Sequence, residues 1–445
     1  MAKRYDVIVV GAGPAGFLAA KAAGENGFNV ALLEKKTDPT QLPRACGQTL
    51  VSMNEYYFGN LVNYNPRDKR MTFSSDGFSF KYDGPYQNLY CIHMYTPNGH
   101  RVAMGDLDAQ KKKGDAGRVG LSFNKEVLFR CYLEEVKACG VEVFPGVNVQ
   151  KVTPKADGVV AEGSGQSFEG RYLIAADGVN SRIAEIMGFN KDRYYYCNLY
   201  ALTYHMTGVE PPAQNVITIT NAFVKDGAAS VFLFPLATAG SHQLALITLN
   251  PKVNLKTTAD FVMKDMFCAP WYKKAKILKT LTAVCNCYAP IAEPYKDRVL
   301  LAGDVGSTQE LEITGAMVSG WKAGQFVSTA LQEENLGLPV TATKQYVDWW
   351  NQAYIKTYDH EIYMKGMARS LILDEEASNY FFGLINETLP AMWNPYSSPT
   401  GAVLQRIMPV LMKERPDVLQ KLQRGALPFA QIIANITKIS KPVSG

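Results

Sequence analysis

The chain has 445 residues, which is too long for one ordinary hydrophobic core and predicts two or three domains. Apolar residues make up 47% and charged residues 20%, which predicts a large buried core and argues against wholesale disorder. The net charge of +5 is spread too thinly to indicate nucleic-acid binding by itself, so we expect no nucleic-acid partner.

The eight cysteines lack the spacings that hold metals. No pair is spaced as C-x-x-C, and nothing matches a zinc ribbon or a ferredoxin motif, so we expect no metal site. The apolar stretch near the amino terminus is too short for a signal peptide, and no run of about eighteen apolar residues occurs. These features favour a reducing, cytoplasmic location with free thiols.

Residues 5–36 predict a complete βαβ unit, in which a buried strand, a glycine turn and an alanine-rich helix lead to a second strand ending at Glu34. Gly11 permits the tight turn, Gly13 lets the backbone approach a pyrophosphate, and Gly16 lets the helix pack close to the strand. The helix amino end offers N–H groups to phosphates, and Glu34 is placed to accept hydrogen bonds from a ribose. The unit therefore predicts dinucleotide binding.

The stretch RACGQTL, residues 44–50, follows this unit and places Cys46 beside a glycine. A lone cysteine is either part of the chemistry or a small, inert side chain that packs in the interior. The residues alone leave both interpretations open.

Two β-rich regions, 76–114 and 191–289, consist of β-branched and aromatic stretches between Gly, Asn and Asp turns. They predict a mixed sheet whose face forms the roof of a substrate cavity. Within the first region, Lys111–Lys113 lie in a charged, glycine-bounded loop. Such a run is typically solvated, and the functional alternative is a docking patch for an acidic electron donor such as a ferredoxin or flavodoxin.

Two later stretches repeat the pattern of an apolar strand followed by a turn of glycine and acid. Residues 172–188 run into Asp177-Gly178, and residues 297–324 run into Gly303-Asp304 and then a small-residue helix start at Gly315 and Ala316. A nicotinamide-binding domain needs no such second and third turn. No second G-x-G-x-x-G occurs, so we expect no dedicated NAD(P)H domain.

Residues 336–445 have the periodicity of helices, with apolar residues at steps of three and four. Its aromatic and methionine residues are typical of a packed core. The region also suits an apolar cap over a cavity for a long hydrophobic substrate, and its carboxy-terminal amphipathic piece is compatible with contact to a membrane surface.

Together, the three glycine turns and Glu34 resemble the FAD-binding framework of the p-hydroxybenzoate hydroxylase and geranylgeranyl reductase superfamily. The resemblance implies an α/β fold with a discontinuous Rossmann-like FAD-binding domain over 1–75, 115–190 and 290–335. It also implies an inserted mixed β-sheet substrate domain over 76–114 and 191–289, with a helical cap over 336–445. In that family the late aspartate meets the ribityl and pyrophosphate part of FAD, which implies that role for Asp304. The helix that begins near Gly315 would point its positive end at the flavin ring. The implied FAD contacts are Gly11, Gly13, Pro14, Ala15, Gly16, Glu34, Lys35, Arg44, Ala45, Cys46, Val149, Asp177, Gly178, Gly303, Asp304, Gly315 and Ala316.

Two short stretches resemble the geranylgeranyl reductases in particular. RACGQTL is similar to their K/R-x-C-G-G motif, which lies beside the isoalloxazine. SVFLFP, residues 230–235, is similar to their Y-x-W-x-F-P cavity motif: Phe234 and Pro235 match, and Phe232 stands where tryptophan is usual. The resemblance implies that reduced FAD delivers hydride to a carbon–carbon double bond of a hydrophobic, prenyl-type or conjugated substrate, with Phe232, Phe234 and Pro235 as substrate contacts. Cys46 is the candidate catalytic residue, which would donate the proton or gate access to the flavin.

Three departures from the family pattern affect the expected site. Gln48 replaces the second glycine of the cysteine motif, and Lys125 and Glu126 stand where an arginine is usual. In the late motif, residues 309–312 replace a proline, and a carboxylate there is a second candidate acid. Glu310 and Glu312 are the carboxylates concerned.

Other functions remain open from the sequence. The same fold supports single-component aromatic hydroxylases that use NAD(P)H and oxygen, in which Arg44 would contact cofactor or donor. Distant relatives act as prenyl-lipid escort proteins without catalysis. The electron donor of a reductase would be an acidic carrier protein or NAD(P)H, and the missing cluster cysteines disfavour electron transfer to quinone as in electron-transfer-flavoprotein dehydrogenases.

Overall fold

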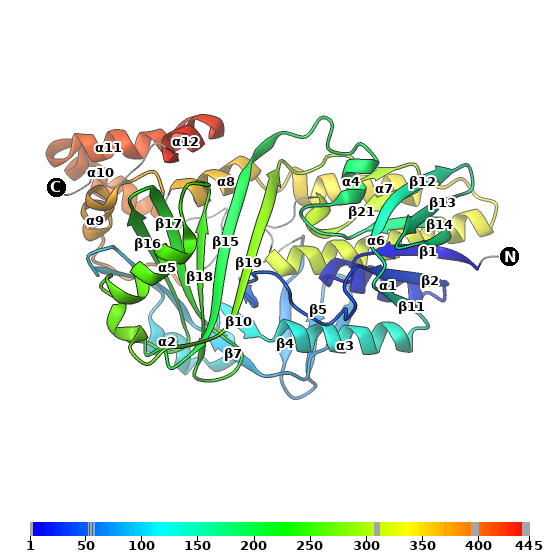
Figure 1. Ribbon diagram of the computed structural model, residues 1–445, viewed down its shortest axis with the longest axis horizontal. Helices are drawn as coiled ribbons and strands as arrows, with labels where there is room; N and C mark the ends of the chain where they lie inside the picture. Colours follow the sequence, from blue (N-terminus) through cyan, green and yellow to red (C-terminus); the bar gives the residue numbers. More distant parts are fainter. Residues whose placement is uncertain are drawn as a thin grey trace.

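The computed structural model describes residues 3–437 except 52, 54, 55, 57, 307–311, 370 and 393–399. Two large sheets stand side by side, and helices cover the first sheet and one end of the second (Figure 1). The described α-helices are α1 Pro14–Glu25, α2 Leu107–Lys112, α3 Lys125–Ala138, α4 Arg182–Ile186, α5 Leu255–Lys264, α6 Glu312–Asn335, α7 Ala342–Trp350, α8 His360–Arg369, α9 Glu375–Gly383, α10 Thr400–Glu414, α11 Pro416–Gln423 and α12 Phe429–Ile436. Short helical turns lie between some of them, among them the 3-10 helix η2 Ala269–Tyr272.

The first large sheet contains the βαβ unit predicted from the sequence. Its strands are β1 Arg4–Val10, β2 Val30–Glu34, β11 Glu142–Pro145, β12 Val149–Lys155, β13 Gly158–Gly163, β14 Gln166–Ala175, β20 Tyr295–Lys296 and β21 Val299–Leu301. The parallel core runs in the order β11-β2-β1-β14-β21. Strand β13 extends it antiparallel to β14, and β12 pairs antiparallel with β13. The run Val7–Val10 is buried, as expected for a parallel strand with both faces covered.

Helices α1 and α6 pack against each other through small residues. A Cβ at Gly320 would lie 2.1 Å from the carbonyl oxygen of Ala15, and one at Gly324 would lie 2.4 Å from that of Ala19. Only glycine permits this close approach. The contact holds the amino ends of both helices at the carboxyl ends of the parallel strands, where ligands bind in such sheets.

The second large sheet is mixed. Its strands are β8 Cys91–Tyr95, β9 Arg101–Met104, β15 Tyr195–Thr207, β16 Val216–Val224, β17 Gly227–Pro235, β18 Ser241–Thr248 and β19 Lys276–Tyr288. They lie in the order β19-β15-β18-β17-β16-β8-β9, and only β8 and β16 are parallel neighbours within this described sheet. Side chains alternate between the two faces. The outer face, with Leu244 and Leu246, packs against α5 and η2.

Two small sheets complete the described β structure. Strands β3 Thr49–Val51, β10 Gly120–Phe123 and β7 Tyr86–Leu89 form one, and β4 Val62–Asn65, β5 Arg70–Phe73 and β6 Phe78–Lys81 form the other. Residues 76–81 therefore belong to the hairpin of β5 and β6, and the domain boundary expected at residue 75 passes through it. The division into domains otherwise stays a proposal.

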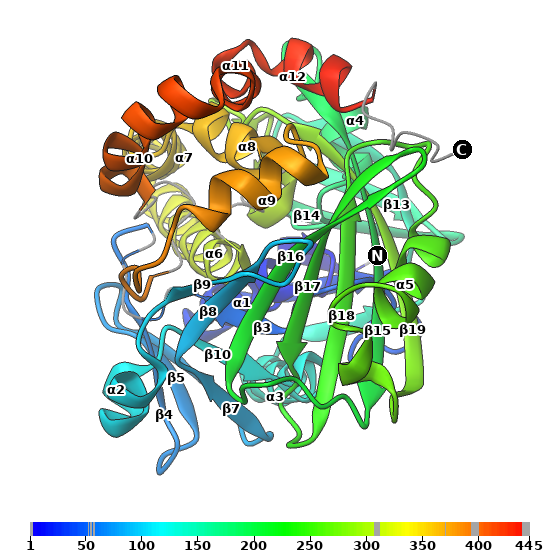
Figure 2. The same cartoon turned by 90° about the vertical axis from the view of Figure 1, so that its left-hand side faces the viewer.

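The carboxy-terminal helices cover one side of the molecule. Figure 2 shows α10, α11 and α12 along that side, with α8 and α9 between them and the sheets. Residues of α8 and α12 pack on the inner face of the second sheet, and α9 and α10 form a further apolar cluster with β9. Among the described residues, no helix has both the length and the apolar character required to cross a bilayer.

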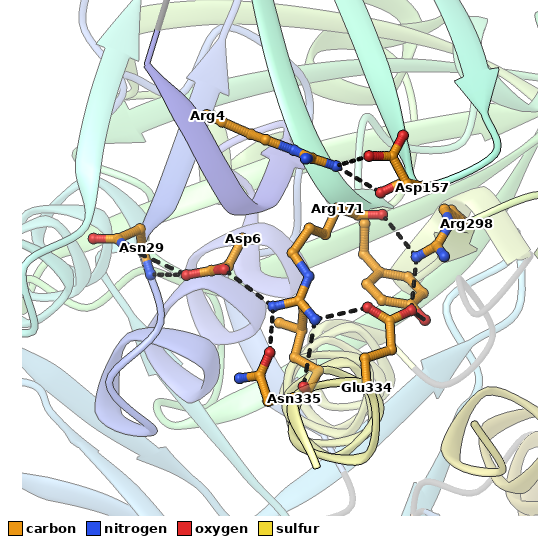
Figure 3. Close-up of polar contacts among 10 residues, drawn as sticks. Arg4, Asp6, Asn29, Asp157, Arg171, Arg298, Glu334 and Asn335 are labelled. Carbon is orange, nitrogen blue, oxygen red and sulfur yellow. Dashed lines mark hydrogen bonds and ion pairs between the residues drawn. The ribbon is translucent and has the colours of Figure 1, made fainter. Parts of the chain in front are cut away.

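A polar network joins the carboxyl end of α6 to the amino ends of β1, β14 and β21 (Figure 3). The carboxylate of Glu334 accepts hydrogen bonds from Arg171 and Arg298, each at 2.8 Å. Although burial opposes ionisation, the hydrogen bonds from Arg171, Tyr172 and Arg298 lower the pKa of Glu334. Since the network lies at the amino ends of the strands, its role is structural. The predicted fold class, an α/β sheet with a second mixed sheet and carboxy-terminal helices, is confirmed.

Candidate active site

The glycine turn between β1 and α1 leaves space for a ligand at one of its three glycines. Gly11 has φ +101°, and a Cβ at Gly16 would lie 1.7 Å from the Gly11 carbonyl oxygen, so the chain's own packing requires both glycines. A Cβ at Gly13 would meet nothing within 4 Å. Open space at the amino end of α1, which begins at Pro14, fits a pyrophosphate held by backbone N–H groups.

Glu34 lies at the end of β2, next to the glycine turn. Its carboxylate is buried and accepts hydrogen bonds from the backbone N–H of Ala12 at 2.6 Å and of Lys36 at 2.8 Å. This geometry holds the acid at the position predicted for a ribose contact. Lys35 is exposed, and Val149 is buried at the start of β12.

The carboxylate of Asp177 is used within its own turn. It accepts hydrogen bonds from Ser181 Oγ at 2.6 Å and from the Arg182 N–H at 2.9 Å, which holds the start of α4. Burial raises the pKa of this carboxyl. Gly178 has φ +90°, and the guanidinium of Arg44 lies 3.9 Å from where its Cβ would be. The structure therefore brings the Asp177-Gly178 turn and the RACGQTL stretch together.

Ser319 connects the Gly303-Asp304 turn to the start of α6. The Gly303 N–H donates to Ser319 Oγ at 3.0 Å, and this hydroxyl donates to the Gly315 carbonyl oxygen at 2.7 Å. Gly303 has φ +70°, and a Cβ there would lie 2.7 Å from that of Ala15. Ala316 is buried beside them. Three predicted contacts with the cofactor are thus joined by a serine that the sequence analysis did not single out.

The second candidate acid is not placed by the structure. Residues 307–311, which include Glu310, lie outside the described residues, and only the backbone of Glu312 is described.

The RACGQTL stretch runs along the free edge of the second sheet. The Ala45 N–H donates to the Thr282 carbonyl oxygen of β19 at 3.2 Å, and Arg44 Nη2 lies 3.8 Å from Cys285 Sγ. Nearby, the Asn180 amide donates to the Val284 carbonyl oxygen of the same strand at 2.8 Å. The connections that follow β2 and β14 of the first sheet therefore both contact β19. The two large sheets meet at the predicted flavin site.

Cys46 is half-buried, and its sulfur lies 3.3 Å from Lys125 Nζ at the start of α3. Gln48 has φ +50°, a left-handed conformation that is uncommon for residues other than glycine. Its side-chain oxygen accepts a hydrogen bond from the Lys125 N–H at 3.0 Å, and its amide nitrogen lies 3.4 Å from His205 Nε2. Gln48 therefore has a backbone conformation that favours glycine, at the position that corresponds to the second glycine of the motif it resembles.

The inner face of the second sheet is apolar, with buried ends and a half-exposed middle. At one end, Phe234 packs with Val51 and Leu89 of the small sheet, and at the other end α8 and α12 cover the strands. Between them, Ile219 and Phe232 are half-exposed. The rings of Phe232 and Phe234 stack with centroids 5.7 Å apart, and the Pro235 carbonyl oxygen accepts a hydrogen bond from Ser122 Oγ at 2.6 Å. This wall can hold a hydrophobic substrate.

An open groove of about 520 Å³ adjoins the RACGQTL stretch. Its lining residues are Asp38, Thr40, Gln41, Leu42, Pro43, Glu126, Lys279 and Leu281. Lys279 Nζ lies 2.9 Å from Glu126 Oε1 across it. Although burial opposes ionisation, hydrogen bonds from Lys279 and from the Leu42 N–H lower the pKa of Glu126. The groove reaches Pro43, next to the segment that contains Cys46.

Sequence reasoning missed His205 and Gln243, which extend this site along the inner face. They are direct cross-strand neighbours on β15 and β18, and Gln243 also pairs with Phe234 of β17. Burial, with a contribution from nearby Lys279, lowers the pKa of His205. The period-two pattern of these strands could have placed both residues on the face that carries Phe234, but not beside Gln48. Among the described residues, no cluster of side chains fits a metal ion, and all eight cysteines are free.

Comparisons with known proteins show the family and the fold of the chain. The sequence profile of the family described as "FAD binding domain" matches residues 4–305. A digeranylgeranylglycerophospholipid reductase of Methanocella arvoryzae is 24% identical over 363 residues, which cover 75% of this chain and 79% of the relative. A crystal structure of a geranylgeranyl bacteriochlorophyll reductase-like protein from Thermoplasma acidophilum matches with a TM-score of 0.67 at 17% identity, covering 95% of this chain and 99% of that one. The anhydrotetracycline hydroxylase OxyS from Streptomyces rimosus matches with a TM-score of 0.53 at 14% identity, covering 100% and 78%. At these identities, the likeness to solved structures shows the fold alone.

Proposed function

The chain belongs to the FAD binding domain family and is an FAD-dependent oxidoreductase, and from this premise we propose that it reduces carbon–carbon double bonds of a hydrophobic, prenyl-type substrate. The observation that carries the proposal is the apolar, half-exposed middle of the inner sheet face, beside which the RACGQTL stretch runs. An apolar wall of this kind suits a polyprenyl chain. The names of the curated relatives support the same substrate class.

The residues that would hold FAD fit the cofactor. Gly13 leaves open space at the amino end of α1, and buried Glu34 lies beside the same turn. The Gly303-Asp304 turn and Gly315 would lie along the ribityl chain and the flavin ring, at the positive end of α6. The remaining predicted contacts, Arg44, Ala45 and Asp177-Gly178 among them, stay part of this proposal.

When bound and reduced, FAD supplies the hydride for one alkene carbon. The protein must supply a proton for the other carbon, and we assign this to Cys46 Sγ. Lys125 Nζ, 3.3 Å from the sulfur, can stabilise the negative charge that remains after the proton leaves, and can return a proton to it. Phe232, Phe234 and Pro235 would orient the substrate and keep water away from the reacting carbons.

The donor that reduces FAD is an acidic carrier protein or NAD(P)H. The groove beside Arg44 offers either one an approach to the site. The proposal places the protein in the cytoplasm, with peripheral contact to the membrane that holds its substrate. It involves no nucleic acid.

The function is tested by anaerobic mixing of the dithionite-reduced, FAD-loaded protein with a polyprenyl lipid, a conjugated enoyl compound or a phenol. We expect the polyprenyl lipid to reoxidise the flavin and to gain two hydrogen atoms for each double bond reduced, as measured by absorbance and mass spectrometry. The protein would instead be an aromatic hydroxylase if the flavin is reoxidised only after air is admitted and if the phenol stimulates the consumption of NAD(P)H in air. A purified protein that binds prenyl lipid without FAD would establish an escort protein.

A further inference from the structure

The segment 252–279 carries an excess of positive charge. It contains seven lysines, two aspartates, and no arginine or glutamate. Its excess of five positive charges equals the net charge of the whole chain, which is +5. The segment forms α5, η2 and the start of β19, and α5 and η2 pack together on the outer face of the second sheet. The segment therefore carries a local excess of positive charge.

The start of β19 adds exposed aliphatic side chains to this charge. Ile277 is 47% exposed and Leu278 is 66% exposed. Lys273, Lys274 and Lys276 precede them and are exposed as well. Because β19 is an edge strand, this end of the sheet faces solvent. Basic side chains next to exposed aliphatic ones are typical of a surface that meets a lipid bilayer.

Of the three exposed lysines at 273, 274 and 276, one forms an ion pair within the described residues. Lys274 pairs with Glu210 at 3.0 Å. The described residues offer no ion-pair partner to Lys273 or Lys276. The two remaining ammonium groups are available to anionic headgroups, and their long apolar stems let them reach out while the aliphatic residues stay at the interface.

We propose that this surface, the lysine edge (Lys273, Lys274, Lys276, Ile277 and Leu278), binds an anionic lipid membrane. Lysine is depleted and arginine is enriched in protein interfaces. A basic surface built from lysine alone therefore favours a bilayer over an acidic protein partner. Ile277 and Leu278 enter the interfacial region, and the lysines bind the headgroups.

The lysine edge adjoins the groove beside the RACGQTL stretch. Lys279 and Leu281, further along β19, line this groove together with Leu42 and Pro43. A membrane bound at the lysine edge would lie next to the groove, so that a lipid substrate passes from the bilayer toward Cys46 without crossing bulk water. This route rests on the proposed function, whereas membrane binding itself does not.

Co-sedimentation of the FAD-loaded, full-length protein with vesicles tests the inference. We expect binding to vesicles of phosphatidylcholine with phosphatidylglycerol, no binding to phosphatidylcholine alone, and weakening by salt. Combined Lys273→Gln, Lys274→Gln and Lys276→Gln substitutions remove three charges and should weaken binding roughly a hundred-fold. The pair Ile277→Ser and Leu278→Ser should abolish the binding that survives high salt. Retained flavin absorbance shows that each variant is folded.

The matched control removes three charges from Lys111 and Lys112 at the end of α2 and from Lys113, which follows it. These lysines are exposed, and the described residues show no exposed aliphatic pair beside them. This variant should bind vesicles like the original protein. Equal losses in both triple variants, or no binding of the original protein to anionic vesicles, would overturn the inference. The inference would also be overturned if the lysine-edge variant binds vesicles normally but its FAD is reduced more slowly by an acidic carrier protein. The surface would then be a docking site for a protein. The lysine-edge variant should turn over a detergent-dissolved prenyl substrate as fast as the original protein. If no form of the protein turns over this substrate while vesicle binding is intact, only the proposed function is overturned.

Discussion

Lys125 Nζ lies 3.3 Å from Cys46 Sγ, and the two residues are 79 positions apart in the chain. The lysine begins α3, and the cysteine lies on the stretch that docks on β19. The contact gives the thiol a positive neighbour, which is what a group that gives up a proton requires.

Replacing Cys46 with alanine should slow substrate reduction about a hundred-fold, which is the lower range for loss of a general acid. The bound FAD should remain, because the other proposed contacts would still hold it. Replacing Lys125 with methionine should slow the same step and change its pH profile. Anaerobic reoxidation of the reduced flavin by a prenyl substrate measures both effects.

The control is Cys139→Ala, which removes another half-buried free thiol, at the end of α3. Its rate should equal that of the original protein. If Cys46→Ala also keeps the original rate with FAD bound, the cysteine is only a packing residue.

The βαβ unit and the three glycine turns could be predicted because their signals are local. Buried strands, glycine spacing and an acid at a strand end are all visible within short stretches such as 5–36. Their meeting at one end of the parallel sheet follows from the rule that ligands bind at the carboxyl ends of parallel strands.

The contacts between distant segments could not be predicted in the same way. Ser319 joins the Gly303-Asp304 turn to the first turns of α6, and Lys125 meets Cys46 because α3 begins beside the RACGQTL stretch. The bonds from Ala45 and Asn180 to β19 depend on how the two large sheets meet. No periodicity or spacing in one chain carries that information.

Gln48 offers a test of backbone strain at the position of the missing glycine. The backbone at Gln48 has φ +50°, a left-handed conformation that is unfavourable for alanine but not for glycine. Both substitutions remove the hydrogen bond to the Lys125 N–H, so only alanine adds backbone strain. We expect Gln48→Ala to be less stable than Gln48→Gly by about 1 kcal/mol. Urea unfolding of the two variants measures the difference. Equal stability would mean that the backbone relaxes at this residue.

Gly13 and Gly16 should respond differently to alanine. At Gly13 the added methyl group meets no protein atom within 4 Å, so Gly13→Ala should leave the FAD-free protein as stable as before and weaken FAD binding about ten-fold or more. At Gly16 the methyl group would lie 1.7 Å from a carbonyl oxygen, so Gly16→Ala should lower stability even without FAD. Flavin titration and thermal unfolding separate the two effects. Unchanged FAD affinity in Gly13→Ala would contradict the assigned cofactor position.

Glu334 should contribute stability that depends on pH. Its side chain is 19% exposed, and Arg171 and Arg298 hold its pKa below the ordinary value. Because the folded pKa is lower than the unfolded one, the stabilisation is complete above about pH 4.3 and is lost as the pH falls through the folded pKa. Glu334→Gln should therefore reduce the free energy of unfolding at neutral pH by about 1–3 kcal/mol, as expected for charged hydrogen bonds in a partly buried network. The difference in free energy of unfolding from the original protein should become smaller in acid, as measured by urea unfolding across pH.

The exposed pair of Arg182 and Glu185 supplies the matched control, since Glu185→Gln should change stability little at any pH. An equal loss in both variants would show that the network at the amino ends of the strands contributes no more than a surface ion pair.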